Sequence, residues 1–236
     1  MKRILVAGAF VLALGGPVLA ADLPPPAAPP PRAPATYVPA PAPYYNWGGI
    51  YFGVNGGGIF GNSAWNPPAG FGVGTGNFTT TGFLVGGTLG ANFQAGAFVF
   101  GVEGDLDWDN LSGSTSGVFC GATCTLTTAQ NYLGTVRGRV GYAWDRVLFY
   151  GTGGGAFGNI KATNSLTGGT DNNNKFGWTA GAGIEFAFAQ NWTAKAEYLY
   201  VSLQNGSCTA SCGGVAVPVS LNENVARIGV NYKFNF

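Results

Sequence analysis

Ten charged residues lie at alternate positions of segments rich in apolar residues, and their types make them the first candidates for chemistry. Five are acids and five are bases, which permits a nearly neutral network of ion pairs. The set comprises Glu103, Asp105, Asp107, Arg137, Arg139, Glu185, Lys195, Glu197, Arg227 and Lys233. Such a network either packs the interior of a fold or forms the charged constriction of a narrow pore.

Four cysteines form two Cys-x-x-x-Cys pairs, Cys120 with Cys124 and Cys208 with Cys212, each in a polar stretch. An even number of cysteines in an exported chain favours disulfides. We expect one bridge within each pair, although three pairings are open in principle. A four-cysteine zinc site is the weaker alternative, because two loops would have to converge in an oxidising compartment.

The chain contains no His, which excludes serine–histidine and cysteine–histidine catalysis and histidine-ligated metals. The Gly-rich run at residues 151–155 is not followed by the Lys-Ser or Lys-Thr pair of a phosphate-binding loop. The carboxylates are expected beside cations, as in structural ion pairs. We therefore expect neither enzyme activity nor a cofactor or metal.

Shifts in composition divide the chain into three parts. Residues 1–20 have a basic start, an apolar core and small residues at the end, as a secretory signal peptide does. Its removal would leave Ala21 and Asp22 at the mature start. Residues 21–46 are rich in Pro and Ala and should form an extended polyproline II linker. The predicted barrel domain spans residues 47–236.

The composition favours a membrane protein without membrane helices. Of the 236 residues, 46% are hydrophobic, 14% aromatic and only 9% charged, which is too little charge for an ordinary soluble surface. Beyond the signal peptide, no uninterrupted apolar run is long enough for a membrane helix. Hydrophobicity spread over alternate positions instead favours a transmembrane β-barrel. The near-neutral charge indicates no nucleic-acid partner.

Eight segments show the period-2 alternation of strands with two unlike faces. They are Trp47–Phe60, Thr80–Gln94, Ala97–Asp109, Asn131–Trp144, Val147–Lys161, Phe176–Ala189, Trp192–Gln204 and Val225–Phe236. Short turns alternate with long polar connections, which are 61–79, 110–130, 162–175 and 205–222. The pattern predicts an all-β, eight-stranded antiparallel up-and-down transmembrane β-barrel with both termini on the short-turn side.

In most of these segments the charged residues have the parity opposite to that of the aromatics. Because a charge facing hydrocarbon costs up to about 2–4 kcal/mol at mid-depth, we expect the charges to line the lumen. A soluble lipocalin-type barrel has the same periodicity with its faces reversed, but these ten charges would be almost its whole solvated surface. The fifth segment is ambiguous, although Ile160 and Lys161 favour its even positions as outward. Candidates for aromatic belts are Trp108, Trp144, Trp178, Trp192 and Tyr142.

Several motifs together resemble the small outer-membrane β-barrel proteins of alphaproteobacteria, often called porin-family or Omp25/Omp31-like proteins and related to the OmpA membrane domain. The motifs are the Ala-Asp-Leu-Pro mature start, Trp47-Gly-Gly-Ile-Tyr-Phe-Gly, the stretch Gly134–Tyr142 and the terminal Val-Asn-Tyr-Lys-Phe-Asn-Phe236. The resemblance implies insertion by the barrel-assembly machinery through the terminal aromatics Tyr232, Phe234 and Phe236. It also implies that Ala21 or Asp22 can be joined to peptidoglycan.

The expected function is therefore structural. We expect an integral protein of the outer membrane of a Gram-negative bacterium, in contact with outer-membrane lipid, with periplasmic termini and surface-exposed loops. Its role would be envelope integrity, with a tether to peptidoglycan through the N-terminus. Two alternatives stay open: a narrow porin-like channel for small solutes, and a surface adhesin or receptor.

Overall fold

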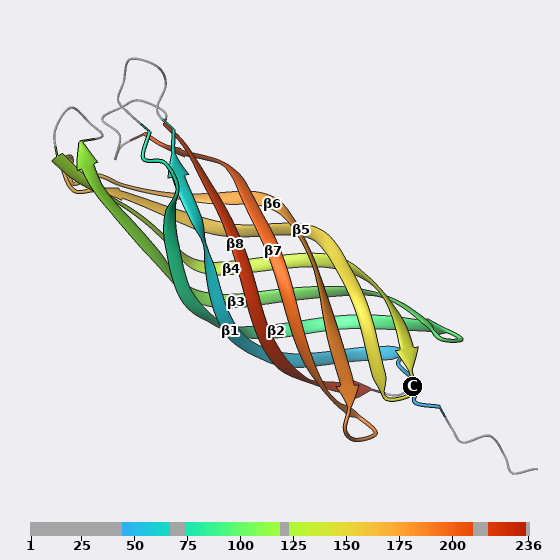
Figure 1. Cartoon of the computed structure of the whole chain (residues 1–236). Coiled ribbons are helices and arrows are strands. Elements are labelled where there is room, and N and C mark those ends of the chain that lie inside the picture. Colours follow the sequence, from blue (N-terminus) through green and yellow to red (C-terminus); the bar gives the residue numbers. More distant parts are fainter. Residues whose placement is uncertain (1–43, 67–73, 119–122, 210–216, 235–236) are drawn as a thin grey trace, which may run out of the picture. The chain divides into compact units, whose positions relative to one another are not determined.

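The computed structural model describes residues 44–66, 74–118, 123–209 and 217–234, and every structural statement below concerns these residues. Eight strands follow one another around a closed antiparallel barrel (Figure 1). They are β1 Gly49–Trp65, β2 Phe78–Ala95, β3 Phe98–Val118, β4 Thr123–Trp144, β5 Val147–Asn164, β6 Thr170–Ala187, β7 Trp192–Cys208 and β8 Val217–Phe234. No helix in the described part of the chain is long and apolar enough to cross a membrane. The predicted fold class is confirmed.

Alternation decides which side of the wall each residue faces. On β3, Val102 and Leu106 are each 63% exposed, whereas Glu103 and Asp105, which lie between them, are buried. Successive side chains of a strand point to opposite faces, so the apolar set covers the outside of the barrel and the ionic set fills the inside. This inverted distribution is stable only where hydrocarbon replaces water around the wall.

The register of the strands fixes the width of the barrel. Partners can be followed from strand to strand around the wall, beginning at β1 and returning to it. The path runs Gly53, Thr88, Asp105, Thr135, Ala156, Gly177, Leu203, Leu221 and Ser63. The path starts at Gly53 and comes back to β1 at Ser63, an offset of ten residues. For eight strands this offset corresponds to a strand tilt of about 40° from the barrel axis. Eight strands with this stagger leave an interior that side chains can fill.

The strands are longer than the sequence suggested. The β3–β4 ladder continues from Phe98–Tyr142 to Val118–Thr123, so most of the predicted loop at residues 110–130 is paired strand. The other three predicted long loops are shortened in the same way at both ends. Strand pairing requires only backbone hydrogen bonds, whereas the apolar alternation used to delimit the strands ends where the wall leaves the lipid.

Outward aromatic side chains form two belts. Near the short turns, Phe98 packs against Tyr142 at 5.7 Å between ring centroids. Further along the strands, Trp108 packs against Phe83 at 6.3 Å. Ten residue steps of a tilted strand separate Phe98 from Trp108, which corresponds to about 25 Å along the barrel axis. That matches the apolar band of outer-membrane barrels. Beyond Trp108, the outward positions of β3 carry Asn and Ser, so this part of the sheet projects beyond the membrane.

The predicted facing of β5 is wrong. Its even positions point inward, since Leu148, Tyr150 and Ile160 are buried, and Phe149 is 49% exposed on the outside. The glycines of residues 151–155 carried no facing signal. Lys161 had suggested that the odd positions face inward. It is exposed, and it lies beyond the aromatic belt that contains Trp108, where an outward cation meets water.

Candidate functional site in the barrel lumen

The structure places all ten charged residues singled out in the sequence on the inner face of the wall, and each is at most 5% exposed. Nine of them are connected in one network of five carboxylates and four cations. Two arginines form its centre, and each is bound by carboxylates from other strands. The network therefore joins opposite sides of the barrel through its interior.

Arg137 on β4 is the first of these centres. Its Nη2 atom lies 2.5 Å from Glu103 Oε1 and 2.6 Å from Asp105 Oδ2, both on β3. Its Nη1 atom lies 2.9 Å from Glu197 Oε1 on β7. A guanidinium presents several donors in a fixed plane, so a single Arg137 can satisfy carboxylates on two sides of the lumen.

Arg227 on β8 is the second centre. Its Nη1 atom lies 2.8 Å from Asp107 Oδ2, and its Nη2 atom lies 3.0 Å from Asp105 Oδ1. The same Nη2 atom is 2.6 Å from Glu197 Oε2. Asp105 and Glu197 are thus shared between both arginines, which makes the two centres one unit.

A second tier lies toward the short turns. Arg139 Nη2 is 2.8 Å from Glu185 Oε2, and the guanidinium stacks 3.9 Å from the ring centroid of Tyr150. Lys195 Nζ lies 3.2 Å from Glu103 Oε1. The hydroxyl of Tyr51 donates to Glu103 Oε2 at 2.7 Å and accepts from Arg139 Nη1 at 2.9 Å. Buried charges are tolerable only when paired and hydrogen-bonded in this way.

Lys233 is the one residue of the ten that does not join the network. Its Nζ atom donates to the carbonyl of Asn46 and lies 4.2 Å from the ring centroid of Tyr45. No carboxylate of the described residues lies within 4.0 Å of it. Burial raises the pKa of Tyr45 to about 12, so its ring remains neutral beside the cation. The assignment of Lys233 to the lumen network is therefore corrected: it fastens the chain that enters β1.

Neutral partners of the network were missed in the sequence. Thr88 and Thr135 donate to the two oxygens of Asp105, at 2.8 and 2.9 Å. Thr193 and Asn231 donate to Glu185 Oε1, at 2.5 and 2.9 Å. All four share the inward parity of their strands, and this parity was a usable signal.

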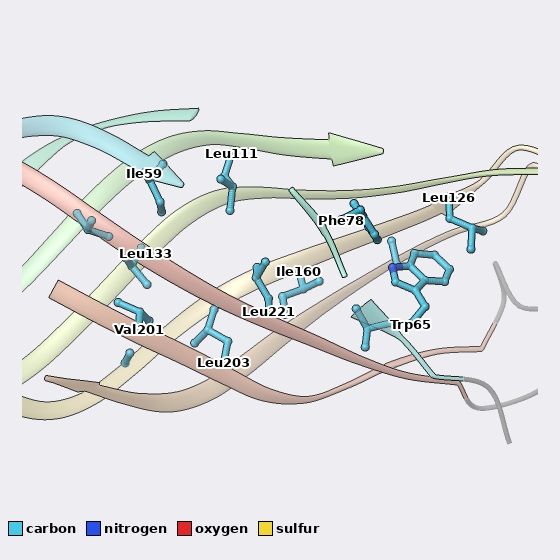
Figure 2. Close-up of a cluster of buried hydrophobic side chains, with 14 of the residues drawn as sticks. Ile59, Trp65, Phe78, Leu111, Leu126, Leu133, Ile160, Val201, Leu203 and Leu221 are labelled. Atoms are coloured by element: carbon cyan, nitrogen blue, oxygen red, sulfur yellow. The ribbon is translucent and has the colours of Figure 1, made fainter. Parts of the chain in front are cut away.

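An apolar layer lies on the side of the network away from the short turns. Figure 2 shows Leu133, Val201, Leu203 and Leu221 among the side chains that meet inside the barrel. Leu203 and Leu221 have no exposed surface, and Leu111 and Leu133 are 1% exposed. These side chains are therefore almost inaccessible to a water-sized sphere, and the layer fills the lumen beyond the network.

The short-turn end is closed by residues 44–48, which we call the entry strap. Trp47 is 1% exposed and packs with Val99, Leu148 and Tyr150. Its backbone N–H donates to Gln94 Oε1 at 2.7 Å, and its indole Nε1 donates to the carbonyl of Asp145 at 3.0 Å. Since Gln94 lies at the end of β2 and Asp145 lies in the turn between β4 and β5, the strap crosses the barrel end and seats its indole in the opening.

The sealed interior limits the chemistry that the lumen can perform. The five carboxylates of the network are held in ion pairs. Where a hydroxyl of the described residues touches one of them, it does so as a hydrogen-bond donor. No cluster of three or more His, Cys, Asp or Glu side chains suited to a metal occurs among the described residues. The arrangement is that of a cross-linked core made from polar groups.

Several predicted site residues lie outside the described part of the chain. These are Ala21, Asp22, Cys120, Cys212 and Phe236, and the side chain of Cys208. Cys124 is buried in β4. The predicted bridges Cys120–Cys124 and Cys208–Cys212 and the N-terminal attachment stay predictions. Of the terminal aromatics, Tyr232 and Phe234 pack together with ring centroids 5.2 Å apart.

Comparison with known proteins agrees with this architecture. Residues 33–234 match the family described as outer membrane protein beta-barrel domain. The chain is 34% identical over 212 residues to a 31 kDa outer-membrane immunogenic protein of Brucella melitensis biotype 1, covering 83% of this chain and 87% of the relative. It is 35% identical over 202 residues to a 25 kDa outer-membrane immunogenic protein of Brucella abortus biovar 1, covering 84% and 85%.

Among solved structures, the outer membrane protein OprG from Pseudomonas aeruginosa has the same fold, with a TM-score of 0.50 at 12% identity. The match covers 81% of this chain and all of that one. The family match spans most of the chain, and both Brucella relatives exceed one-third identity over more than four-fifths of it. The chain belongs to the outer-membrane β-barrel family that includes these Brucella proteins.

Proposed function

We propose that this protein is a structural element of the outer membrane, a closed barrel that contributes to envelope integrity. The carrying observation is the sealed lumen. Arg137, Arg227 and their carboxylates cross-link its middle, while an apolar layer fills one end and Trp47 fills the other. A wall tied together through its interior resists deformation, whereas a solute has no route past these side chains.

Conductance decides between this role and a narrow channel. The refolded full chain in planar lipid bilayers should give no current steps above the leak, with an open porin in the same lipid as positive control. A matched variant, Trp47→Ala, should also stay closed, because the ion-pair network and the apolar layer remain. Reproducible steps in the wild-type protein would replace the structural proposal with the channel.

The proposed orientation puts the short turns and both termini in the periplasm. Short periplasmic turns and longer extracellular extensions are usual for outer-membrane barrels. The entry strap leads into β1 at this end, so the linker before it would be on the side of the cell wall. We propose that Ala21 or Asp22 is joined to peptidoglycan. Cell walls boiled in detergent should retain the protein until the glycan is digested. A chain lacking residues 21 and 22 should be released by detergent alone, and full release of the wild-type chain would disprove the tether.

A surface adhesin or receptor is the second candidate. It is favoured by the β3–β4 sheet beyond Trp108, whose outward positions are uncharged and mostly polar. The Brucella relatives are named immunogenic proteins, which agrees with a part that reaches the cell surface. Cells carrying the full chain, or a variant with residues 112–127 replaced by a two-residue turn, can be compared for adherence to immobilised matrix proteins and glycans. Equal adherence would exclude this sheet as the binding part.

A further inference from the structure

Two carboxyl groups in the upper lumen, the part beyond the network and away from the short turns, have no role in the ion-pair network. Asp109 on β3 and Glu223 on β8 face inward at the level where the aromatic belt ends, among the side chains of the apolar layer. Asp109 is 2% exposed and Glu223 has no exposed surface. On the wall, Glu223 lies opposite Val201 of β7, and Asp109 lies opposite Leu84 of β2.

The two groups are unequally satisfied. Asp109 Oδ2 accepts from Gln130 Nε2 at 3.1 Å, and Asp109 Oδ1 accepts from the backbone N–H of Leu111 at 3.3 Å. Glu223 Oε1 and Oε2 accept no hydrogen bond from any described residue, and neither does Gln130 Oε1. The Asp109 carboxyl opposes the ionisation of Glu223 and the Gln130 side chain favours it, so the three side chains form one polar group.

The local backbone supports this grouping. The β3–β4 register shifts between Trp108 and Leu111, and the β4–β5 register shifts between Ala129 and Leu133. Asp109 and Gln130 therefore stand on neighbouring irregularities of the sheet. Irregularities of this kind redirect side chains, and they are frequent near functional groups.

No base among the described residues neutralises these carboxyls. The nearest cation along β8 is Arg227, which is bound by Asp107, Asp105 and Glu197. Lys175 of β6 has the inward parity, but it forms no ion pair with either group within 4.0 Å. The facing residues of β1, β2, β4, β5 and β7 at this level carry no titratable side chain.

Two ionised carboxylates cannot share an apolar layer without a counter-charge. Burial disfavours the charged form of each, and each disfavours the ionisation of the other. Each carboxyl oxygen of Glu223 has less than 1 Å² of accessible surface. A water molecule or a cation therefore does not fit beside these oxygens unless the apolar side chains move. The smallest neutralising ligand is a proton, which needs no room and turns one acceptor into a donor.

We propose that Asp109 and Glu223 form a proton-binding site, holding one proton between them at neutral pH. The protonated Glu223 carboxyl becomes a hydrogen-bond donor, and the ionised Asp109 accepts from Gln130. The site makes the apolar layer of the upper lumen sensitive to pH. It does not depend on the proposed structural function of the barrel.

The sign of the pH effect follows from proton linkage. The folded barrel holds a proton that the unfolded chain, with a water-exposed Glu, releases above pH about 4.3. Stability therefore decreases as pH rises above that value, and the unfolding equilibrium constant increases by up to about tenfold per pH unit until the folded site also loses its proton.

Infrared difference spectroscopy of the refolded full chain tests the site directly. At pH 7 the wild-type barrel should show the carbonyl stretch of a buried protonated carboxylic acid, and Glu223→Gln should lack it. The matched control Asp171→Asn, a partly exposed carboxyl on β6, should keep it. Absence of the band from the wild-type protein, or its persistence in both Glu223→Gln and Asp109→Asn, would overturn the proposal.

Unfolding by urea in detergent gives an independent readout. Between pH 5 and pH 9 the unfolding equilibrium constant of the wild-type barrel should increase. In Glu223→Gln the increase over the same range should be at least tenfold smaller. For both proteins, the unfolding curve in calcium chloride should coincide with the curve in the presence of a chelator. A calcium-dependent stabilisation confined to the wild type would assign the site to a cation, and a carboxylic-acid band that appears only in Lys175→Met would assign the counter-charge to that lysine. Either result would refute the proton site.

Discussion

Arg137 on β4 and Glu197 on β7 meet inside the barrel, with 2.9 Å between Nη1 and Oε1, although their strands are not neighbours in the sheet. Backbone hydrogen bonds join only adjacent strands. This contact ties two parts of the wall together through the lumen, in the way that a hydrophobic core joins the layers of a soluble protein.

Removal of that tie should be strongly destabilising. Arg137→Met leaves Glu103, Asp105 and Glu197 buried with fewer counter-charges, and breaking a buried pair from one side costs about 3–5 kcal/mol. Urea unfolding in detergent micelles measures the loss. Lys161→Met, at an exposed cation of β5, is the matched control and should change the free energy of unfolding by less than about 0.5 kcal/mol. Equal effects of the two variants would contradict a structural network.

The entry strap should also contribute to stability. Trp47→Ala removes a fully buried indole and its hydrogen bond to Asp145, and large aromatic-to-alanine changes in a packed site cost about 3–5 kcal/mol. Tyr44→Ala, at a side chain that is 80% exposed, should have little effect. Unfolding curves that coincide for Trp47→Ala and the wild type would mean that the strap does not hold the barrel end.

Two glycines of β2 should respond differently to the same substitution. A Cβ atom at Gly90 would lie within 3.0 Å of the Tyr51 ring, whereas a Cβ atom at Gly87 would lie 3.8 Å from the carbonyl oxygen of Gly53. Gly90→Ala must therefore displace Tyr51 from Glu103, and overpacking of this kind costs about 1–3 kcal/mol. Gly87→Ala should stay within about 0.5 kcal/mol of the wild type in urea unfolding. A larger loss of stability for Gly87→Ala than for Gly90→Ala would mean that the Tyr51 ring does not lie against Gly90.

The terminal strand supplies a prediction about assembly. If Tyr232 and Phe234 are the recognition signal for the barrel-assembly machinery, replacing both by Ala should reduce the folded fraction in cells. Folded barrel can be followed by its heat-modifiable mobility on gels. Phe188→Ala, at an exposed aromatic after β6, is the control and should fold normally. A similar yield from all three proteins would remove these residues from the signal.

The sequence alone determined the architecture and the facing of most strands, because a period of two translates directly into two faces of a wall. The charges of β3, such as Glu103 and Asp105, were assigned inward from parity together with the cost of exposing them to lipid. Where parity carried no signal, as in the glycines of β5, the facing was predicted wrongly.

Tertiary structure decided the rest. Apolar alternation marks only the part of a strand that lies in lipid, so the full length of β3 and β4 required the backbone pairing itself. Parity places Lys233 and Arg137 on the same face, yet only the closure of the barrel determines that Arg137 reaches Glu197 and that Lys233 reaches Asn46. The buried pair of Asp109 and Glu223 was missed for the same reason, since it depends on which positions of β3 and β8 share a level after eight strands have closed with a stagger of ten residues.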